Sequence, residues 1–178
     1  MFTEIEAKLK VDSLPEVEQK LAALGAEFLA EQVQRDYHFD NAAGTLAGSD
    51  KCLRLRRQAI GDTEKFYLTY KGAKEKSDFK KRPEIETEIA DADSAEKLLA
   101  GLGYEKVFAV EKKRRLWKFC GCEVALDELP SLGDFIEIEG PDDEKIAEVQ
   151  QRLGLAHLPH IPKSYAQLLK EGLRRREV

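Results

Sequence analysis

Acidic and basic residues alternate with apolar residues near the start of this chain. Single apolar residues separate Glu4, Glu6 and Lys8, a spacing that puts their side chains on one face of a β-strand. Carboxylates are hard oxygen ligands suited to Mg²⁺ or Mn²⁺, whereas lysine and arginine side chains suit phosphate oxygens. The opening strand therefore carries groups that a divalent metal and a phosphate would need.

Charged residues recur at strand spacing along the chain, and they are sorted by strand. Further acidic strands carry Asp127, Glu137 and Glu139. The basic strands carry Arg54, Arg56, Lys71, Lys112 and Arg114. A solvated face gives no reason for such sorting, because exposed ion pairs contribute little to stability. The sorting indicates a shared target such as a metal-bound polyphosphate; the alternative is an ordinary sheet whose charged face is exposed to water.

Eight segments have the alternation and composition of strands, with turns or mobile loops between them, including one at residues 41–50. The segments cover residues 4–8, 35–40, 52–57, 65–72, 84–89, 107–119, 122–129 and 135–139. A helix is expected after the first, fifth and eighth segments, and another near the C-terminus. Ser13 with Glu16, and Asp93 with Glu96, have the spacing of capping boxes at two of these helices.

These elements predict an α+β fold in one domain that spans residues 1–178. Four amphipathic helices can cover the apolar strand faces, which leaves the charged faces on the inside. Eight antiparallel strands that close into a barrel would then enclose a polar tunnel with helices packed outside. Charges removed from water need counter-ions, so a charged lining implies a charged ligand.

Composition excludes several classes of partner. The formal net charge is −5, so there is no overall basic field to attract nucleic acid. There is no apolar run of membrane-spanning length, and the N-terminus leads directly into a strand instead of a signal peptide. The three cysteines have no disulfide or zinc spacing and are expected to be reduced thiols. We therefore expect a cytoplasmic protein without a nucleic-acid or membrane partner.

The order of these motifs resembles the CYTH superfamily of triphosphate tunnel metalloenzymes. The Glu-x-Glu-x-Lys signature at residues 4–8 is followed in order by "LRLR", "LTYKG", "RPEIE", "EKKR", "LDEL", "LGDFIEIE" and "PKSYAQLL", over essentially the whole chain. The superfamily includes class IV adenylyl cyclases, thiamine triphosphatases and inorganic triphosphatases. The resemblance implies an eight-stranded antiparallel tunnel barrel and a requirement for Mg²⁺ or Mn²⁺.

The resemblance also implies roles for individual residues. It implies that a metal is bound by Glu4, Glu6, Glu137 and Glu139, with Asp127 close to them. It implies that triphosphate is bound by Lys8, Arg54, Arg56, Lys71, Arg82, Lys112, Arg114 and Lys163. Glu84 and Glu86 are interpreted as wall residues that hold basic side chains. Ser164 and Tyr165 are expected to start a helix that closes one side of the tunnel, although simple capping and packing would explain them equally well.

The chain departs from the superfamily at His38. Relatives commonly carry Asp-x-Tyr-aromatic-Asp on the second strand, whereas this chain has histidine at the tyrosine position between Asp36 and Asp40. In some triphosphatases the tyrosine is thought to tune a lysine that acts on the attacking water, and Lys8 and Lys71 are the candidate catalytic lysines here. His38 could act as a base or relay. We expect its imidazole instead to be a structural pin bonded between the two aspartates.

The resemblance favours an enzyme that converts ATP into cyclic AMP and pyrophosphate, because the chain length and the "LGDFIEIE" stretch look most like prokaryotic class IV cyclases. The alternative activity is hydrolysis of inorganic triphosphate or thiamine triphosphate. A third alternative is a protein that binds polyphosphate or a nucleotide without turnover. Close relatives often look dimeric, so the resemblance also allows a homodimer.

Overall fold

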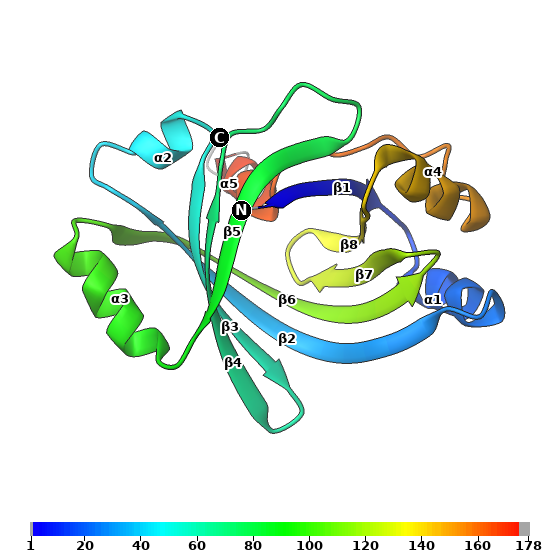
Figure 1. Ribbon diagram of the computed structural model, residues 1–178, viewed down its shortest axis with the longest axis horizontal. Coiled ribbons are helices and arrows are strands. Elements are labelled where there is room, and N and C mark those ends of the chain that lie inside the picture. The colour runs from blue at the N-terminus through cyan, green and yellow to red at the C-terminus, as the bar shows by residue number, and fades with distance from the viewer. Residues whose placement is uncertain (1, 175–178) are drawn as a thin grey trace.

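Among residues 2–174, which the computed structural model describes, eight strands close into one antiparallel barrel (Figure 1). Around the barrel the strand order is β1-β5-β4-β3-β2-β6-β7-β8. The bounds are β1 Phe2–Lys10, β2 Glu27–Asp40, β3 Cys52–Ile60, β4 Thr63–Lys71, β5 Lys80–Ile89, β6 Glu105–Phe119, β7 Cys122–Leu129 and β8 Gly133–Glu139. The predicted α+β barrel is therefore confirmed.

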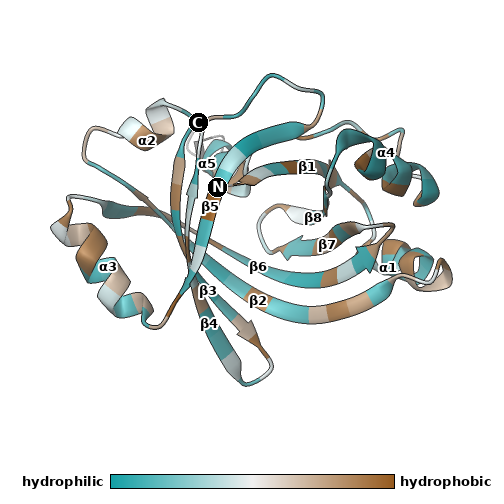
Figure 2. Cartoon of the chain, viewed as in Figure 1, coloured by the Kyte–Doolittle hydropathy of each residue, from teal (hydrophilic) through white to brown (hydrophobic). Residues whose placement is uncertain are grey.

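The strand register turns the charged faces inward. In β1, Glu4, Glu6 and Lys8 are each at most 4% exposed and line the barrel interior. The intervening Ala7 and Leu9 are buried on the opposite face, against the helices. Figure 2 shows the same alternation of hydrophilic and hydrophobic residues along the barrel strands. The two-residue period of the sequence thus decides which side chains can meet inside.

Five helices lie outside the barrel within the described residues (Figure 1). Their bounds are α1 Leu14–Ala23, α2 Thr45–Gly48, α3 Ala92–Gly101, α4 Asp143–Arg152 and α5 Tyr165–Arg174. The largest apolar cluster joins α1 and α4 to the outer faces of β1, β7 and β8. Separate clusters lie beneath α3 and α5. No helix in residues 2–174 combines the length and the apolar content that crossing a bilayer requires.

Two details of the helices differ from the sequence-based expectation. Helix α3 is capped by Asp91, whose carboxylate accepts hydrogen bonds from the backbone N–H groups of Asp93 and Ser94, at 3.0 and 3.3 Å. Asp93 lies in its first turn and is not the cap. The loop expected at residues 41–50 contains α2, because the Asp40 carboxylate accepts hydrogen bonds from backbone N–H groups of the segment and stabilises its first turn.

The Gly140 position generates a prediction about packing between β8 and α4. A Cβ atom there would lie 2.8 Å from Cys122 Sγ and 2.9 Å from Ile146 Cγ1, both of which are buried. We expect Gly140→Ala to lower the free energy of unfolding by about 1–3 kcal/mol, because the core must shift to admit the methyl group. Denaturant unfolding measures the change.

The matched control is Gly101→Ala in α3, where an added Cβ has no neighbour within 4 Å. Alanine has the higher helix propensity, so the control should be neutral or stabilising by up to about 1 kcal/mol. Equal destabilisation by both substitutions would contradict the packing argument.

Candidate active site in the barrel lumen

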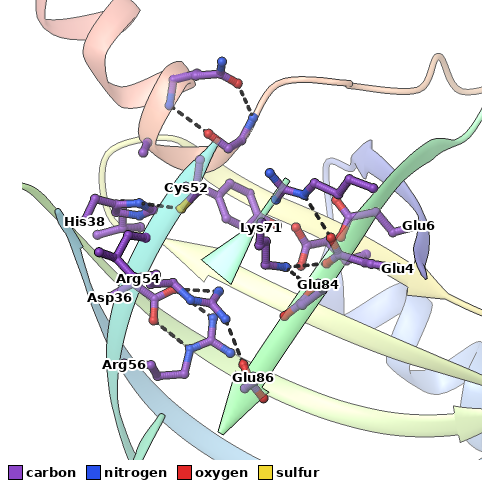
Figure 3. Close-up of a pocket in the computed structure, with 18 of the residues that line it drawn as sticks. Glu4, Glu6, Asp36, His38, Cys52, Arg54, Arg56, Lys71, Glu84 and Glu86 are labelled. Atoms are coloured by element: carbon purple, nitrogen blue, oxygen red, sulfur yellow. Dashed lines mark hydrogen bonds and ion pairs between the residues drawn. The ribbon is translucent and has the colours of Figure 1, made fainter. Parts of the chain in front are cut away.

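A cavity of about 410 Å³ lies inside the barrel and is lined by residues from all eight strands and from α5. We call it the lumen. Most of the predicted site residues meet in it: Glu4, Glu6, Lys8, His38, Arg54, Arg56, Lys71, Arg82, Lys112, Arg114, Glu137 and Glu139. The wall residues Glu84 and Glu86 and the helix-start residues Ser164 and Tyr165 also line it. Figure 3 shows several of these side chains pointing toward one another.

One group of ion pairs is centred on Glu4 and Lys71 (Figure 3). The Lys71 ammonium lies 2.6 Å from the Glu4 carboxylate and 2.7 Å from that of Glu84. Arg82 donates from Nε to the other oxygen of Glu4 at 3.1 Å. Burial alone would raise the pKa of Glu4, but the nearby lysine and arginine charges outweigh it and lower the pKa well below its usual range. Glu84 thus holds a basic side chain, as predicted.

Lys80 also lines the lumen, although the sequence pattern predicts a loop between the strand segments at 65–72 and 84–89. Its ammonium pairs with Glu6, which lies opposite it in the register between β1 and β5. Strand β5 begins at Lys80, so Lys80, Arg82 and Glu84 alternate on the lumen face. The period-two alternation, extended by one step toward the N-terminus, would have identified this residue.

Unlike Glu4, Glu6 and Glu137, Glu139 forms no ion pair with any residue in 2–174. It lies opposite Glu6 in the register between β1 and β8. Burial, together with the charges of Glu4 and Glu6, raises the pKa of Glu139 to about 8. This end of the lumen therefore has an excess of carboxylate, and a bound cation would offset it.

The carboxylates suit a hard divalent cation by ligand type, since Mg²⁺ and Mn²⁺ prefer oxygen donors. Within the described residues, however, no three carboxylate, histidine or cysteine side chains already form a metal-binding group. Glu4 and Glu6 are held by lysines. Metal binding would thus require these carboxylates to exchange a lysine for the cation, and the predicted metal site stays a prediction.

A second group of ion pairs joins β2, β3 and β5. Arg56 donates two hydrogen bonds to the carboxylate of Asp36, at 2.7 and 2.8 Å. Arg54 lies 3.5 Å from Asp36 and 3.2 Å from Glu86, the second predicted wall residue. Burial would raise the pKa of Asp36, but Arg56 and Arg54 outweigh it and lower the pKa far below its usual range. Two guanidinium groups are therefore held side by side in the wall.

A third group surrounds Asp127, which is fully buried behind the lumen wall and does not line the cavity. Its carboxylate accepts hydrogen bonds from Lys112 at 3.1 Å, from Arg114 at 2.7 and 2.5 Å, and from the Tyr165 hydroxyl at 2.8 Å. Asp127 is therefore placed to position two cations, and nothing in this location supports the metal-binding role predicted for it. Tyr165 contributes more than capping and packing.

Glu137 extends the third group into the lumen. It lies 3.2 Å from Lys8 and also pairs with Arg114. The Lys8 ammonium is 4.1 Å from the centroid of the Tyr165 ring, within the range of a cation–π contact. Burial and the Arg114 charge lower the pKa of Lys112 to about 8. Three basic side chains thus share two carboxylates at this end of the lumen.

The expectation that His38 is pinned between Asp36 and Asp40 is wrong. Asp36 is occupied by arginines and Asp40 caps α2, whereas His38 Nδ1 lies 3.4 Å from Cys52 Sγ. A bulge between His38 and Phe39 changes the register at this point. Burial lowers the pKa of His38 to about 4, because its effect is larger than that of the Asp36 charge, which raises the pKa. His38 is therefore neutral at pH 7.

Lys163 does not line the lumen. Its ammonium lies 2.8 Å from Glu171 on α5, and the side chain is half exposed. Only its backbone carbonyl reaches the site, where it accepts a hydrogen bond from Lys8 Nζ at 3.0 Å. Lys170 lines the cavity from the same helix. Sequence reasoning missed Lys170, because the direction of α5 relative to the barrel is not encoded in the periodicity of the helix.

The CYTH domain profile matches residues 3–165. The chain belongs to the CYTH family. A curated relative named adenylate cyclase CyaB, from Aeromonas hydrophila, is 28% identical over 96% of this chain and 90% of its own length. A Pyrococcus horikoshii protein of known structure is 30% identical with a TM-score of 0.82, covering 95% of this chain and 99% of that one.

Another protein of known structure, the putative adenylyl cyclase HpAC1 from Hippeastrum, shares the fold with a TM-score of 0.74 at 21% identity. The alignment covers 95% of this chain and 96% of the Hippeastrum chain. That protein is described as having a dominant triphosphatase activity. Two activities, adenylate cyclase and triphosphatase, are thus named among proteins that are similar to this chain.

The burial of Asp127 predicts a large cost for its removal. Asp127→Ala would leave Lys112 and Arg114 without this partner in the wall, and we expect a loss of about 3–5 kcal/mol in the free energy of unfolding. Asp93→Ala is the control, because Asp93 pairs with Arg57 at an exposed position where solvent screens the charges. Denaturant unfolding of both variants should give a much smaller effect for Asp93→Ala; similar losses would contradict the assignment.

The lowered pKa of His38 predicts a pH-dependent loss of stability. The unfolded chain takes up a proton near pH 6.5, whereas the folded protein does so only near pH 4, so acid favours the unfolded state between these values. From pH 7 to pH 5 the wild type should lose about 1–2 kcal/mol more than His38→Gln does. Denaturant unfolding at both pH values measures this difference, and parallel losses would show that His38 is not held neutral.

Proposed function

We propose that this CYTH protein is a class IV adenylyl cyclase, a metal-dependent enzyme that converts ATP into cyclic AMP and pyrophosphate. The observation that carries the proposal is the composition of the lumen. Paired basic side chains lie on one part of its wall, and the carboxylate Glu139, which has no ion-pair partner among residues 2–174, lies beside Glu4 and Glu6. A triphosphate with a divalent cation is complementary to both features.

The phosphate groups would be bound by side chains that now pair with lumen carboxylates. Arg54 and Arg56 offer planar donor groups suited to phosphate oxygens, and Lys8, Lys112 and Arg114 offer further charges. Because each cation already lies in a fixed pair, binding exchanges one anionic partner for another. The lumen therefore needs little rearrangement of its charge to accept the phosphate chain.

Glu4, Glu6 and Glu139 would hold the divalent cation, with Glu137 adjacent in the same strand as Glu139. Such a cation, when bound, supplies positive charge beside the reacting phosphate and lowers the pKa of an attacking hydroxyl. Lys71 and Lys80 would then be released from Glu4 and Glu6. Their ammonium groups would become available to phosphate oxygens in the same region.

In the cyclisation, the ribose 3′ oxygen forms a bond to the α phosphorus. The bond from that phosphorus to the bridging oxygen breaks, and its electron pair leaves with pyrophosphate, while the hydroxyl proton is released. The lysines and arginines of the wall would stabilise the charge that develops on pyrophosphate. Lys8 and Lys71 would orient the phosphate chain so that the α phosphorus faces the 3′ oxygen.

Hydrolysis of a triphosphate is the alternative, favoured by the triphosphatase activity described for the Hippeastrum protein of the same fold. The same basic wall would serve if water attacked a terminal phosphorus in place of the ribose oxygen. Incubation of the pure protein with ATP and Mg²⁺ or Mn²⁺ separates the two. We expect cyclic AMP and pyrophosphate; formation of orthophosphate without cyclic AMP would overturn the cyclase in favour of the hydrolase.

Glu139→Gln tests the metal-binding role. The substitution keeps the side-chain size and breaks no ion pair within residues 2–174, so the fold should persist while turnover falls at least about 100-fold at low Mg²⁺. Raising the Mn²⁺ concentration should restore part of the rate. Glu128→Gln, at an exposed position of β7, is the control and should keep full activity. Full activity of Glu139→Gln at low metal would contradict the assignment.

A further inference from the structure

Three glutamine side chains lie together in the lumen, where most neighbours are charged. Gln34 Nε2 donates hydrogen bonds to Gln32 Oε1 at 2.7 Å and to Gln58 Oε1 at 2.9 Å. All three line the cavity, and Gln34 is only 1% exposed. We call these three residues the glutamine cluster. It is a polar surface without charge, inside a lumen otherwise suited to phosphate and metal.

Gln34 contains a buried acceptor that makes no hydrogen bond to the described part of the chain. Its Nε2 has two protons, and it donates both to the Oε1 atoms of the neighbouring glutamines. Its Oε1 is fully buried and has no partner in residues 2–174. Buried carbonyl oxygens are normally paired, and an unpaired one costs about 1–3 kcal/mol. A ligand that donates a hydrogen bond would remove this cost.

The other two glutamines offer donors beside that acceptor. The Nε2 groups of Gln32 and Gln58 form no hydrogen bond within residues 2–174, while their Oε1 atoms are occupied by Gln34. Leu116 also lines the lumen and provides an apolar surface two residues along β6 from Arg114, which lies opposite Gln32. One acceptor, adjacent donors and an apolar contact match the edge and the face of a nitrogen heterocycle that carries an amino group.

The glutamine cluster is adjacent to the basic wall. Gln34 lies opposite Lys112 in the register between β2 and β6, and Gln58 lies two residues beyond Arg56 on the lumen face of β3. Two residues along a strand span about 7 Å. A heterocycle bound at the cluster is therefore close enough to remain covalently linked to phosphates bound by Arg56 and Lys112.

We propose that the glutamine cluster binds the organic part of the substrate and recognises the exocyclic amino group of a nitrogen heterocycle. The Gln34 side chain turns so that Oε1 faces the lumen and accepts a hydrogen bond from the amine, and Nε2 of Gln32 or Gln58 donates to the adjacent ring nitrogen. This inference rests on the proposed function, because it requires the phosphates to lie in the lumen. It excludes inorganic triphosphate as the best ligand. The amine can belong to the adenine of ATP or to the aminopyrimidine of thiamine triphosphate.

Calorimetric titration with Mg²⁺ and four probes tests the proposal: ATP, ITP, thiamine triphosphate and inorganic triphosphate. ITP carries an oxo group where ATP carries the amine, so its oxygen would face Gln34 Oε1. Wild type should bind ATP or thiamine triphosphate at least about tenfold more tightly than ITP and inorganic triphosphate. A comparison of the affinities for ATP and thiamine triphosphate identifies the source of the amine.

Gln34→Leu should weaken binding of the preferred amine-bearing ligand about tenfold or more and leave inorganic triphosphate within about twofold. Gln58→Leu provides a second variant at a less buried position, and thermal unfolding checks that each variant folds. The matched control is Gln151→Leu on the exposed surface of α4, which should change no affinity.

The outcomes separate this inference from the proposed function. Equal affinity of wild type for ATP, thiamine triphosphate, ITP and inorganic triphosphate would overturn the glutamine assignment and leave a triphosphate site in place. The glutamine assignment would also be overturned if folded Gln34→Leu and Gln58→Leu lost equal affinity for the amine-bearing ligand and for inorganic triphosphate. Failure of wild type to bind any of the four probes would overturn both proposals.

Discussion

The structure depends on the pairing of charges that the barrel removes from water. A charged side chain inside a protein needs an opposite charge or several hydrogen bonds to offset its desolvation. Here the strand register supplies these partners: β1 against β5 brings Glu4 to Arg82, and β2 against β3 brings Asp36 to Arg56. The barrel can therefore keep a charged interior only while its register is correct.

Two lumen residues that lack a partner for a polar group, Glu139 and Gln34, each carry a functional proposal. Glu139 has carboxylate neighbours and forms no ion pair within the described residues, which raises its pKa. Gln34 has a buried carbonyl oxygen without a partner in the same part of the chain. Natural proteins retain unsatisfied groups mainly where function requires them. The first suits a cation, and the second suits a hydrogen-bond donor on the organic part of a ligand whose phosphates lie on the adjacent basic wall.

Much of the fold and of the site could be predicted from alternation, because a period of two determines which face of a strand each residue occupies. This was enough to place Glu4, Arg56 and Lys112 inside a barrel with helices outside. Alternation does not determine which side chains pair with one another across neighbouring strands. His38 does not bond to Asp36 and Asp40 as predicted, because a bulge shifts the register there and Asp36 is paired with arginines. The glutamine cluster was missed because amides add no charge to the pattern.

The most direct test of the account is a crystal structure of the protein with inorganic triphosphate and Mn²⁺. The account predicts triphosphate inside the lumen, with phosphate oxygens on Arg56 and Lys112 in place of their carboxylate partners. It also predicts an anomalous Mn²⁺ signal beside Glu139. Triphosphate on the outer surface, with the Asp36–Arg56 pair intact and no Mn²⁺ in the lumen, would contradict it.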